Sequence, residues 1–345
     1  MAYATIDNPA LFFEATTYTG GATDVSSLSF QPDWVWAKKR DGSENHGLFD
    51  SVRGATKTLN SNDNAAESTR SGSLTSFDSD GWTMGGSDGI ISASGSTYVG
   101  WAWKAGTTSS ISGGSITPAA VSINATSGFG IYRYTGTGSN GTIAHGLGTA
   151  PKFIVTKNRD SSSYGWYVYH VGIGATKNLY LHNTDAEVTS SNRWNDTAPT
   201  STLFTLSTND GVNGSSANML AYAFSEVKGY SKFGSYTGNG NADGPFVYTG
   251  FKPAWVLTKA SSRTGRWRVW DNKRSTFNVA DKRLDPSSSD AVSTGSTEAI
   301  DIISNGFKIR TSEGQFNGDG ETNIYMAFAE NPFVTAGTKA AGTAR

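Results

Sequence analysis

The feature that most constrains the fold of this chain is one order of landmarks that occurs three times. The tripeptide Tyr-Thr-Gly heads each of the three copies, at Tyr18, Tyr134 and Tyr236, and occurs once more within the third copy, at Tyr248. Each copy is followed by a proline-led segment that ends in lysine: PDWVWAK from Pro32, PKFIVTK from Pro151 and PAWVLTK from Pro253. Self-similarity at a spacing of about a hundred residues indicates repeated structural units.

Later landmarks keep the same order in each copy. A short aromatic segment comes next, then an Asp-Gly or Asn-Gly turn, then a closing aromatic segment. The phrase Gly-Ala-Thr-Lys-x-Leu occupies residues 54–59 and 174–179, and a looser counterpart occupies residues 279–284. Because this phrase holds no histidine, carboxylate or cysteine, we interpret it as structural.

These landmarks divide the chain into five segments. Unit one covers residues 1–106, unit two residues 128–226 and unit three residues 227–334. Residues 107–127 are rich in Gly, Ser and Thr and predict either a linker or an extended docking strand. We expect units two and three to touch and unit one to have more freedom. The tail, residues 335–345, is expected to fray or to dock on a neighbour.

Composition and alternation favour β-structure. The chain has 41 glycines and nine prolines, and it carries ten Trp, fourteen Tyr and seventeen Phe. In PKFIVTK, Phe153 and Val155 alternate with Ile154 and Thr156, which is typical of half-buried strands. We therefore predict an all-β protein of three tandem, jelly-roll-like β-sandwich units of about a hundred residues each. Only the stretch around Ala65 favours a turn or two of helix.

Charge and targeting signals exclude several classes. The 28 basic residues nearly balance 29 acidic ones, so the net charge of −1 gives no field to attract nucleic acid. The chain has no cysteine, and no stretch nears the ~20 apolar residues of a membrane span. The N-terminal sequence lacks a secretory pattern. We expect assembly in a cytoplasm, without membrane insertion, cofactor or metal.

The four histidines offer little chemistry. His170 ends an aromatic segment, but the equivalent position (its station in the repeat) holds Asp50 in unit one and Asp271 in unit three. A residue type that changes in this way favours a loop anchor over a general base. For His145 we expect a hydrogen bond that orders its loop. His182 lies near Asp185 without a recognisable third member of a triad.

Other candidate sites are weak as well. The acids Glu14, Asp50, Glu298 and Asp301 are scattered and do not form a matched pair of the kind that glycosidases use. NGDGET at 317–322 resembles part of a calcium loop without the closing glutamate, and GTGSNG at 136–141 opens no helix. We expect Trp34, Trp101, Trp103 and Trp255 in the core and Trp82, Trp194 and Trp270 to be less constrained.

Longer phrases carry a family resemblance. FQPDWVWAKKRDGSENHGLFDSVRGATKTL, AAES, LTSFDSDGWTMG and TYVGWAWKAG in unit one resemble a repeat common in structural proteins of marine tailed phages, cyanophages included. HGLGTAPKFIVTK in unit two is similar to a phrase of phage tail-fibre proteins, and MAFAENPF near the end fits the same group. Unit three departs from the pattern, because NKRSTFNVADKR replaces RGATK.

The resemblance implies a virion component and not an enzyme. We expect a surface-exposed tail fibre, spike or capsid appendage that contributes to host attachment. Its partners would be other virion proteins, further copies of itself, with a trimer favoured, and a glycan or receptor on the host. The alternative is a carbohydrate-binding or carbohydrate-cleaving module with an exposed aromatic platform around Trp194 or Trp270. A cellular adhesin is the third hypothesis, and the missing export signal counts against it.

Overall fold

The computed structural model describes residues 4–21 and 24–337. Antiparallel sheets dominate these residues, and the α-helices among them are single turns of four residues: α1 (Ser191–Trp194), α2 (Asp210–Asn213) and α3 (Gly314–Asn317). Two 3-10 turns, η1 (Pro9–Leu11) and η2 (Ser296–Glu298), complete the helical content of this part of the chain. The predicted all-β fold is confirmed. The expected end of the tail, residues 338–345, lies outside the described residues.

Unit one consists of a large and a small sheet. Its large sheet contains, in spatial order, β1 (Phe13–Thr19), β9 (Thr97–Trp103), β3 (Trp34–Lys39), β4 (Gly47–Asp50), β5 (Lys57–Asn60) and β6 (Ser68–Thr69). Its small sheet contains β2 (Asp24–Val25), β8 (Gly81–Met84) and β7 (Leu74–Asp78). The helix expected around Ala65 is wrong, because Asp63 accepts from the backbone N–H of Ala65 and holds this loop in a turn that enters β6.

Unit two repeats this plan. Its large sheet contains β10 (Ala120–Asn124), β11 (Phe129–Thr135), β18 (Asn218–Ser225), β13 (Pro151–Asn158), β14 (Trp166–His170), β15 (Lys177–Tyr180) and β16 (Val188–Thr189). Its small sheet pairs β12 (Gly141–Ala144) with β17 (Leu203–Leu206). Since β10 comes from residues 107–127, this segment includes a docking strand and is more than a linker.

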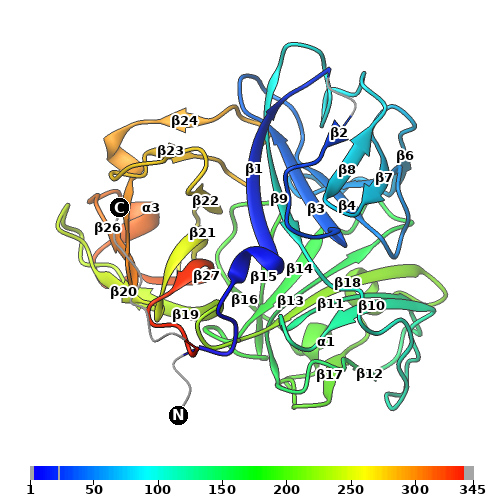
Figure 1. Cartoon of the computed structure of the whole chain (residues 1–345). Helices are drawn as coiled ribbons and strands as arrows, with labels where there is room; N and C mark the ends of the chain where they lie inside the picture. Colours follow the sequence, from blue (N-terminus) through cyan, green and yellow to red (C-terminus); the bar gives the residue numbers. More distant parts are fainter. Residues whose placement is uncertain (1–3, 22–23, 338–345) are drawn as a thin grey trace.

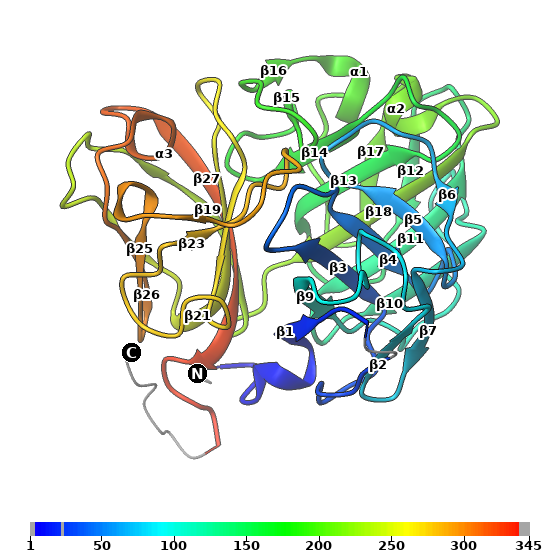
Figure 2. The same cartoon turned by 90° about the horizontal axis from the view of Figure 1, so that it is seen from above.

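Unit three follows the same order. Its large sheet contains β19 (Ser231–Thr237), β27 (Thr322–Pro332), β21 (Phe251–Ala260) and β22 (Arg268–Asp271). Its small sheet contains β20 (Phe246–Tyr248), β26 (Gly306–Ile309) and β25 (Ile300–Ile303), and a separate ribbon pairs β23 (Lys282–Arg283) with β24 (Ser293–Thr294). The strand order first, last, proline-led, next is therefore common to all three large sheets. Figures 1 and 2 show unit three beside the other two units.

The repeated Tyr-Thr-Gly closes each unit onto its own late turn. The hydroxyl of each tyrosine donates to a backbone carbonyl: Tyr18 to Ile91 at 3.0 Å, Tyr134 to Val212 at 2.5 Å and Tyr236 to Phe316 at 2.9 Å. Burial raises the pKa of all three hydroxyls, so each stays a donor at neutral pH. The landmark thus ties the first strand of a unit to the turn that precedes its last strand.

The alternation within strands separates two cores. Phe153 and Val155 of β13 lie in a cluster to which all three units contribute, whereas Ile154 between them lies in a cluster that belongs to unit two. We call the first cluster the shared core; its members include Trp34, Trp36, Trp101, Trp103, Phe153, Val155, Trp166, Tyr222, Phe224, Trp255, Trp267 and Phe328. For β13 the prediction of a half-buried strand is wrong, because a second core takes the place of solvent.

The shared core also corrects the expected freedom of unit one. Trp34 of unit one stacks on Tyr222 of unit two with ring centroids 4.6 Å apart, and Phe13 stacks on Phe328 of unit three at 5.2 Å. At the centre the three units leave a cavity of only about 10 Å³, bordered by apolar side chains, among them Trp34, Phe153 and Trp255. That volume barely admits one water molecule and offers it no polar partner, so the centre of the shared core is closed to water.

We predict that the three units unfold together. Calorimetry should show a single transition whose calorimetric and van't Hoff enthalpies agree, because no unit can leave the shared core without exposing the other two. Leu206→Ala, in the core that belongs to unit two alone, should cost about 2–5 kcal/mol and shift the whole transition to lower temperature. A separate early transition for unit two would contradict the prediction.

Candidate functional site

Ring N–H groups join the units in a closed cycle. The indole Nε1 of Trp166 in unit two donates to the carbonyl of Asn60 in unit one at 2.7 Å. Trp267 in unit three donates likewise to Tyr180 in unit two, also at 2.7 Å. His46 takes the same station in unit one and contacts the carbonyl of Asp285 in unit three at 3.1 Å.

The tautomer of His46 follows from its neighbours. Its Nδ1 accepts from the indole N–H of Trp36 at 2.9 Å, so its Nε2 carries the proton that it donates to Asp285. Burial first, and the charge of Lys38 next, hold the pKa of His46 well below its ordinary value. A neutral imidazole here therefore does the work that an indole does in the other two units.

A second cycle consists of backbone hydrogen bonds. The N–H of the residue just before the β6, β16 or β24 region donates to a carbonyl of the neighbouring unit: Glu67 to Arg159 at 2.8 Å, Glu187 to Ser261 at 2.8 Å and Val292 to Arg40 at 2.9 Å. Each unit thus gives one such bond and receives one. These bonds therefore help to fix how the units fit together.

Buried ion pairs lie at two of the three joints. Asp50 accepts from the Nε of Arg53 at 2.5 Å and from the hydroxyl of Tyr222, in unit two, at 2.7 Å. The equivalent Asp271 accepts from Arg274 at 2.5 Å and from the indole of Trp101, in unit one, at 2.9 Å. Both ion pairs have fully buried side chains.

The third joint is built without charge. His170 stands at the station of the aspartates and Ile173 at that of the arginines, and Met326 replaces the aromatic donor. The Nδ1 of His170 accepts from the backbone N–H of Gly172 at 2.9 Å, and its Nε2 lies 3.0 Å from the carbonyl oxygen of Tyr325 in unit three. His170 is therefore a loop anchor and an interunit donor, and burial lowers its pKa to about 4.

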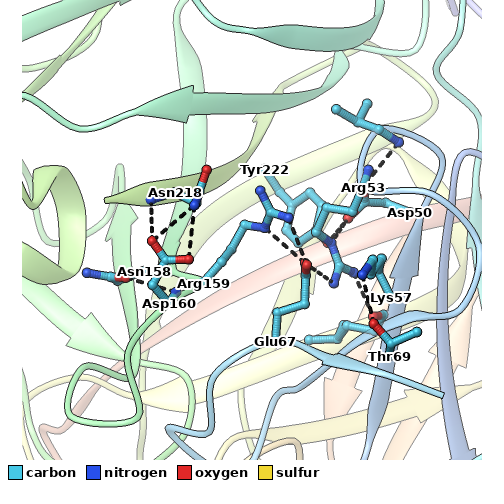
Figure 3. Close-up of polar contacts among 12 residues, drawn as sticks. Asp50, Arg53, Lys57, Glu67, Thr69, Asn158, Arg159, Asp160, Asn218 and Tyr222 are labelled. Carbon is cyan, nitrogen blue, oxygen red and sulfur yellow. Dashed lines mark hydrogen bonds and ion pairs between the residues drawn. The ribbon is translucent and has the colours of Figure 1, made fainter. Parts of the chain in front are cut away.

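Figure 3 shows the joint between units one and two. Glu67 accepts from both Nε and Nη2 of Arg159, at 2.9 and 2.8 Å, and from Nη1 of Arg53 at 3.2 Å. Burial raises the pKa of the Glu67 carboxyl and the two guanidinium groups lower it, with a net shift below its ordinary value. A carboxylate held by two arginines stays ionised and serves as a clamp.

The lysines that end the three proline-led segments are buried and bind backbone carbonyls. Lys157 donates to the carbonyls of Asn64, Ser161 and Tyr164 at 3.0, 3.0 and 2.5 Å, so it too reaches from unit two to unit one. Burial lowers the pKa of Lys157 to about 8 and that of Lys259 to about 7. These lysines fasten the loop that follows each central strand.

The remaining candidate residues also have structural places. The Nδ1 of His145 accepts from the backbone N–H of Leu147, which confirms its expected role in ordering the loop. His182 accepts from the backbone N–H of Trp166, whereas the carboxylate of Asp185 accepts from Asn183. The structure therefore does not join this histidine and aspartate into a triad.

The scattered acids remain apart in their contacts. Glu14 accepts from the backbone N–H of Ser29, and Asp50 lies in the joint described above. Glu298 pairs with Arg268 at 3.0 Å and Asp301 with Arg310 at 3.4 Å. No two of the four share a partner in these contacts, so the arrangement is that of separate structural pairs.

Two Gly-rich motifs form the turns beside the Tyr-Thr-Gly landmarks. Asn317, the first residue of NGDGET, donates to the side chain of Asn239 at 3.0 Å and to the carbonyl of Asn241 at 2.8 Å. Asn213 does the same for the GTGSNG loop, where it contacts Thr137 and the carbonyl of Ser139. Within residues 4–21 and 24–337, His, Asp and Glu side chains form no group of three that could hold a metal ion.

The tryptophans expected to be less constrained are all buried. Trp82, Trp194 and Trp270 are each at most 1% exposed, so the expected platform around Trp194 or Trp270 is wrong. The reason is that all three fill the cores between the large and small sheets. Among the described residues, the large aromatic side chains that are exposed lie instead in unit three, and the largest exposed fractions are 78% for Phe277 and 58% for Tyr248.

Surface hollows lie where units meet. A polar groove of about 420 Å³ runs beside the Glu67–Arg159 clamp and is bordered by Arg133, Asp160 and Asn218. Figure 3 shows Asp160 and Asn218 near the clamp. A smaller hollow of about 210 Å³ lies in unit three beside Tyr248, and Glu226 at the end of unit two also borders it. Among the described residues, no helix is long and apolar enough to cross a membrane.

The sequence holds a signal for two of the three joints. Asp50 and Arg53 are separated by two residues, and Asp271 and Arg274 repeat that spacing at the same station. Nothing in the sequence, by contrast, indicates that Glu67 of unit one meets Arg159 of unit two. The exposure of Tyr248 was also hidden, since its strand reads like any short β-segment.

A family model matches residues 8–332, which is nearly the whole chain and all three units. The chain belongs to the DUF7483 family, a domain of unknown function. The match ends at the last residue of β27, so the family's domain comprises the complete three-unit assembly. Neither the curated proteins nor the solved structures contain a match to this DUF7483 chain.

The Tyr222 hydroxyl should contribute measurably to the joint between units one and two. Tyr222→Phe removes a donor to the buried carboxylate of Asp50 and should lower the free energy of unfolding by about 1.5–3 kcal/mol in chemical denaturation. Tyr248→Phe makes the same chemical change at an exposed ring and should cost almost nothing. Equal losses for the two variants would contradict the assignment.

The stability of the protein should fall as the pH is lowered from 7 to 5, in part through His170. Below pH 6.5 the unfolded chain binds a proton on this imidazole, whereas the folded chain excludes it until about pH 4. The expected loss from this one group is about 2 kcal/mol at pH 5. Denaturation at both pH values should show that His170→Asn has a pH dependence smaller by this amount; an unchanged dependence would contradict the prediction.

Proposed function

We propose that this protein is a non-enzymatic structural component of a tailed-phage particle, exposed on its surface as a fibre, spike or capsid appendage. The observation that carries the proposal is the use made of the repeated polar residues. Asp50, Arg53, Lys157 and His170 are buried and hold the three units together. Residues at these positions make the protein rigid, and a component of a phage particle requires a rigid structure.

Sequence and geometry support the proposal from different sides. The phrases that resemble phage structural proteins contain the joint residues, since Asp50 and Arg53 stand in the phrase FDSVRG. A body closed by cyclic hydrogen bonds resists local opening, because no edge of one large sheet can separate without breaking bonds to a neighbour. This suits a protein that must keep its shape outside a cell.

The partners follow from the same proposal. Other virion proteins would hold the chain on the particle, which is assembled in the host cytoplasm, and a host glycan or receptor would contact its loops. The homotrimer stays a prediction: light scattering of the purified chain should give about three times 36.5 kDa. A mass of one chain would contradict the trimer. In that case the three units of a single chain would take the place of three separate copies.

The decisive experiment uses particles purified from a culture that carries the gene for this chain. After density-gradient centrifugation, mass spectrometry should recover the chain with the major capsid protein at a fixed ratio across the particle peak. Immunogold labelling of intact particles should then place it on their surface. Recovery only from the soluble fraction of the lysed host would overturn the proposal.

A further inference from the structure

The small sheet of each unit has an edge strand, and one position on that strand is equivalent in all three units. Val25, Ile143 and Val247 lie opposite the buried aromatic residues Trp82, Phe204 and Phe307, respectively. The strands β2, β12 and β20 are therefore equivalent and can be compared residue by residue. The residue that precedes this station is Asp24 in unit one, Thr142 in unit two and Phe246 in unit three.

In unit two a segment of the same chain covers this edge. The backbone N–H of Ile116 donates to the carbonyl of Thr142 at 2.9 Å, and the N–H of Thr142 donates to the hydroxyl of Ser115 at 2.8 Å. The side chain of Ile116 is buried in the core of unit two. Residues 113–118, Gly-Gly-Ser-Ile-Thr-Pro, thus provide the cover segment for β12.

In unit one the equivalent edge is short and charged. The strand β2 has two residues, and its Asp24 is exposed. A charged residue on a short edge strand is a common way to discourage further pairing. Unit one therefore protects its edge by charge and unit two by a cover segment.

Among the residues that the structure describes, unit three uses neither protection. The N–H of Ile309 donates to the carbonyl of Pro245, and the N–H of Thr249 to that of Asn305, at 3.1 and 3.0 Å. In an antiparallel pair this alternation directs the N–H and C=O groups of Phe246 and Tyr248 away from β26. Within residues 4–21 and 24–337, these outward groups make no hydrogen bond to another segment.

The side chains on this edge are apolar and exposed. Phe246 and Tyr248 point to the same face of β20 and are 46% and 58% exposed, whereas Val247 between them is buried. Tyr248 also borders the hollow of about 210 Å³, together with Thr249, Ser231 and Lys232. Free backbone groups, two aromatic faces and an adjacent hollow lie together along one strand.

We propose that the β20 edge binds an extended segment of a different polypeptide, composed like the cover segment of small residues followed by a β-branched apolar residue. The main chain of that segment would pair with Phe246 and Tyr248, as Ser115 and Ile116 pair with Thr142 in unit two. Its apolar side chain would pack on the exposed rings. This is strand addition to a sheet edge, in which backbone bonds give affinity and side chains give specificity.

The test is an NMR titration of the full chain with the synthetic peptide Gly-Gly-Ser-Ile-Thr-Pro. At peptide concentrations of about a millimolar, the expected range for a segment this short, the amide signals of Phe246, Tyr248 and Thr249 should shift. Hydrogen exchange at the outward amides of Phe246 and Tyr248 should be fast without peptide and slow with it. This second readout needs no variant.

A matched pair of variants separates backbone pairing from other contacts. Tyr248→Pro removes an N–H that β26 does not use, so the sheet keeps its bonds while the edge loses its donor. It should weaken peptide binding at least tenfold, whereas the control Tyr248→Ala, which loses the same ring but keeps the N–H, should weaken it clearly less. Thermal unfolding of both variants monitors the fold.

Three results would overturn the proposal. The peptide could shift only signals remote from β20, or bind equally well to Tyr248→Pro and to the parent. Alternatively, the parent could self-associate without peptide in a manner that Tyr248→Pro abolishes, which would assign the edge to a second copy of this chain. None of these results bears on the presence of the protein in a particle, so this inference and the proposed function fail independently.

Discussion

Aromatic and aliphatic side chains from three large sheets meet in the shared core, and the other features of the molecule are arranged around that contact. Because this core covers one face of each large sheet and a small sheet covers the other, the central strands are buried on both sides. Polar groups at the strand ends then lie at dry joints, where each needs a partner. For Asp50, Asp271 and His170 the neighbouring unit provides such a partner.

The joints show how one geometric need is met with different chemistry. Units one and three use an aspartate, an arginine and an aromatic donor, whereas the joint between units two and three uses His170, Ile173 and a backbone carbonyl. A neutral imidazole leaves no buried charge to be paired, so the arginine is dispensable there. His46, which replaces an indole in the ring N–H cycle, is a second case of the same exchange.

The three units differ at the edge strands of their small sheets, and this difference is informative about function. The three edge strands are equivalent by register, yet one is charged, one is covered and one is aromatic and, among the described residues, uncovered. Evenly repeated residues such as Tyr18, Tyr134 and Tyr236 explain the fold, because every unit needs the same closure. The edge at Phe246 and Tyr248 is not needed for the closure of its own unit, so it is the feature for which we propose a partner.

The sequence by itself determined the all-β class and the loop role of His145, because these depend on local pattern and on short-range hydrogen bonds. It did not determine that the alternating faces lie between two cores, that Trp194 and Trp270 are buried, or that unit one is held as firmly as the others. Alternation predicts two faces without saying what covers each. Only the tertiary structure brings Glu67 to Arg159 and leaves Tyr248 exposed, because contacts between units depend on how whole sheets pack and not on the residues nearby in the chain.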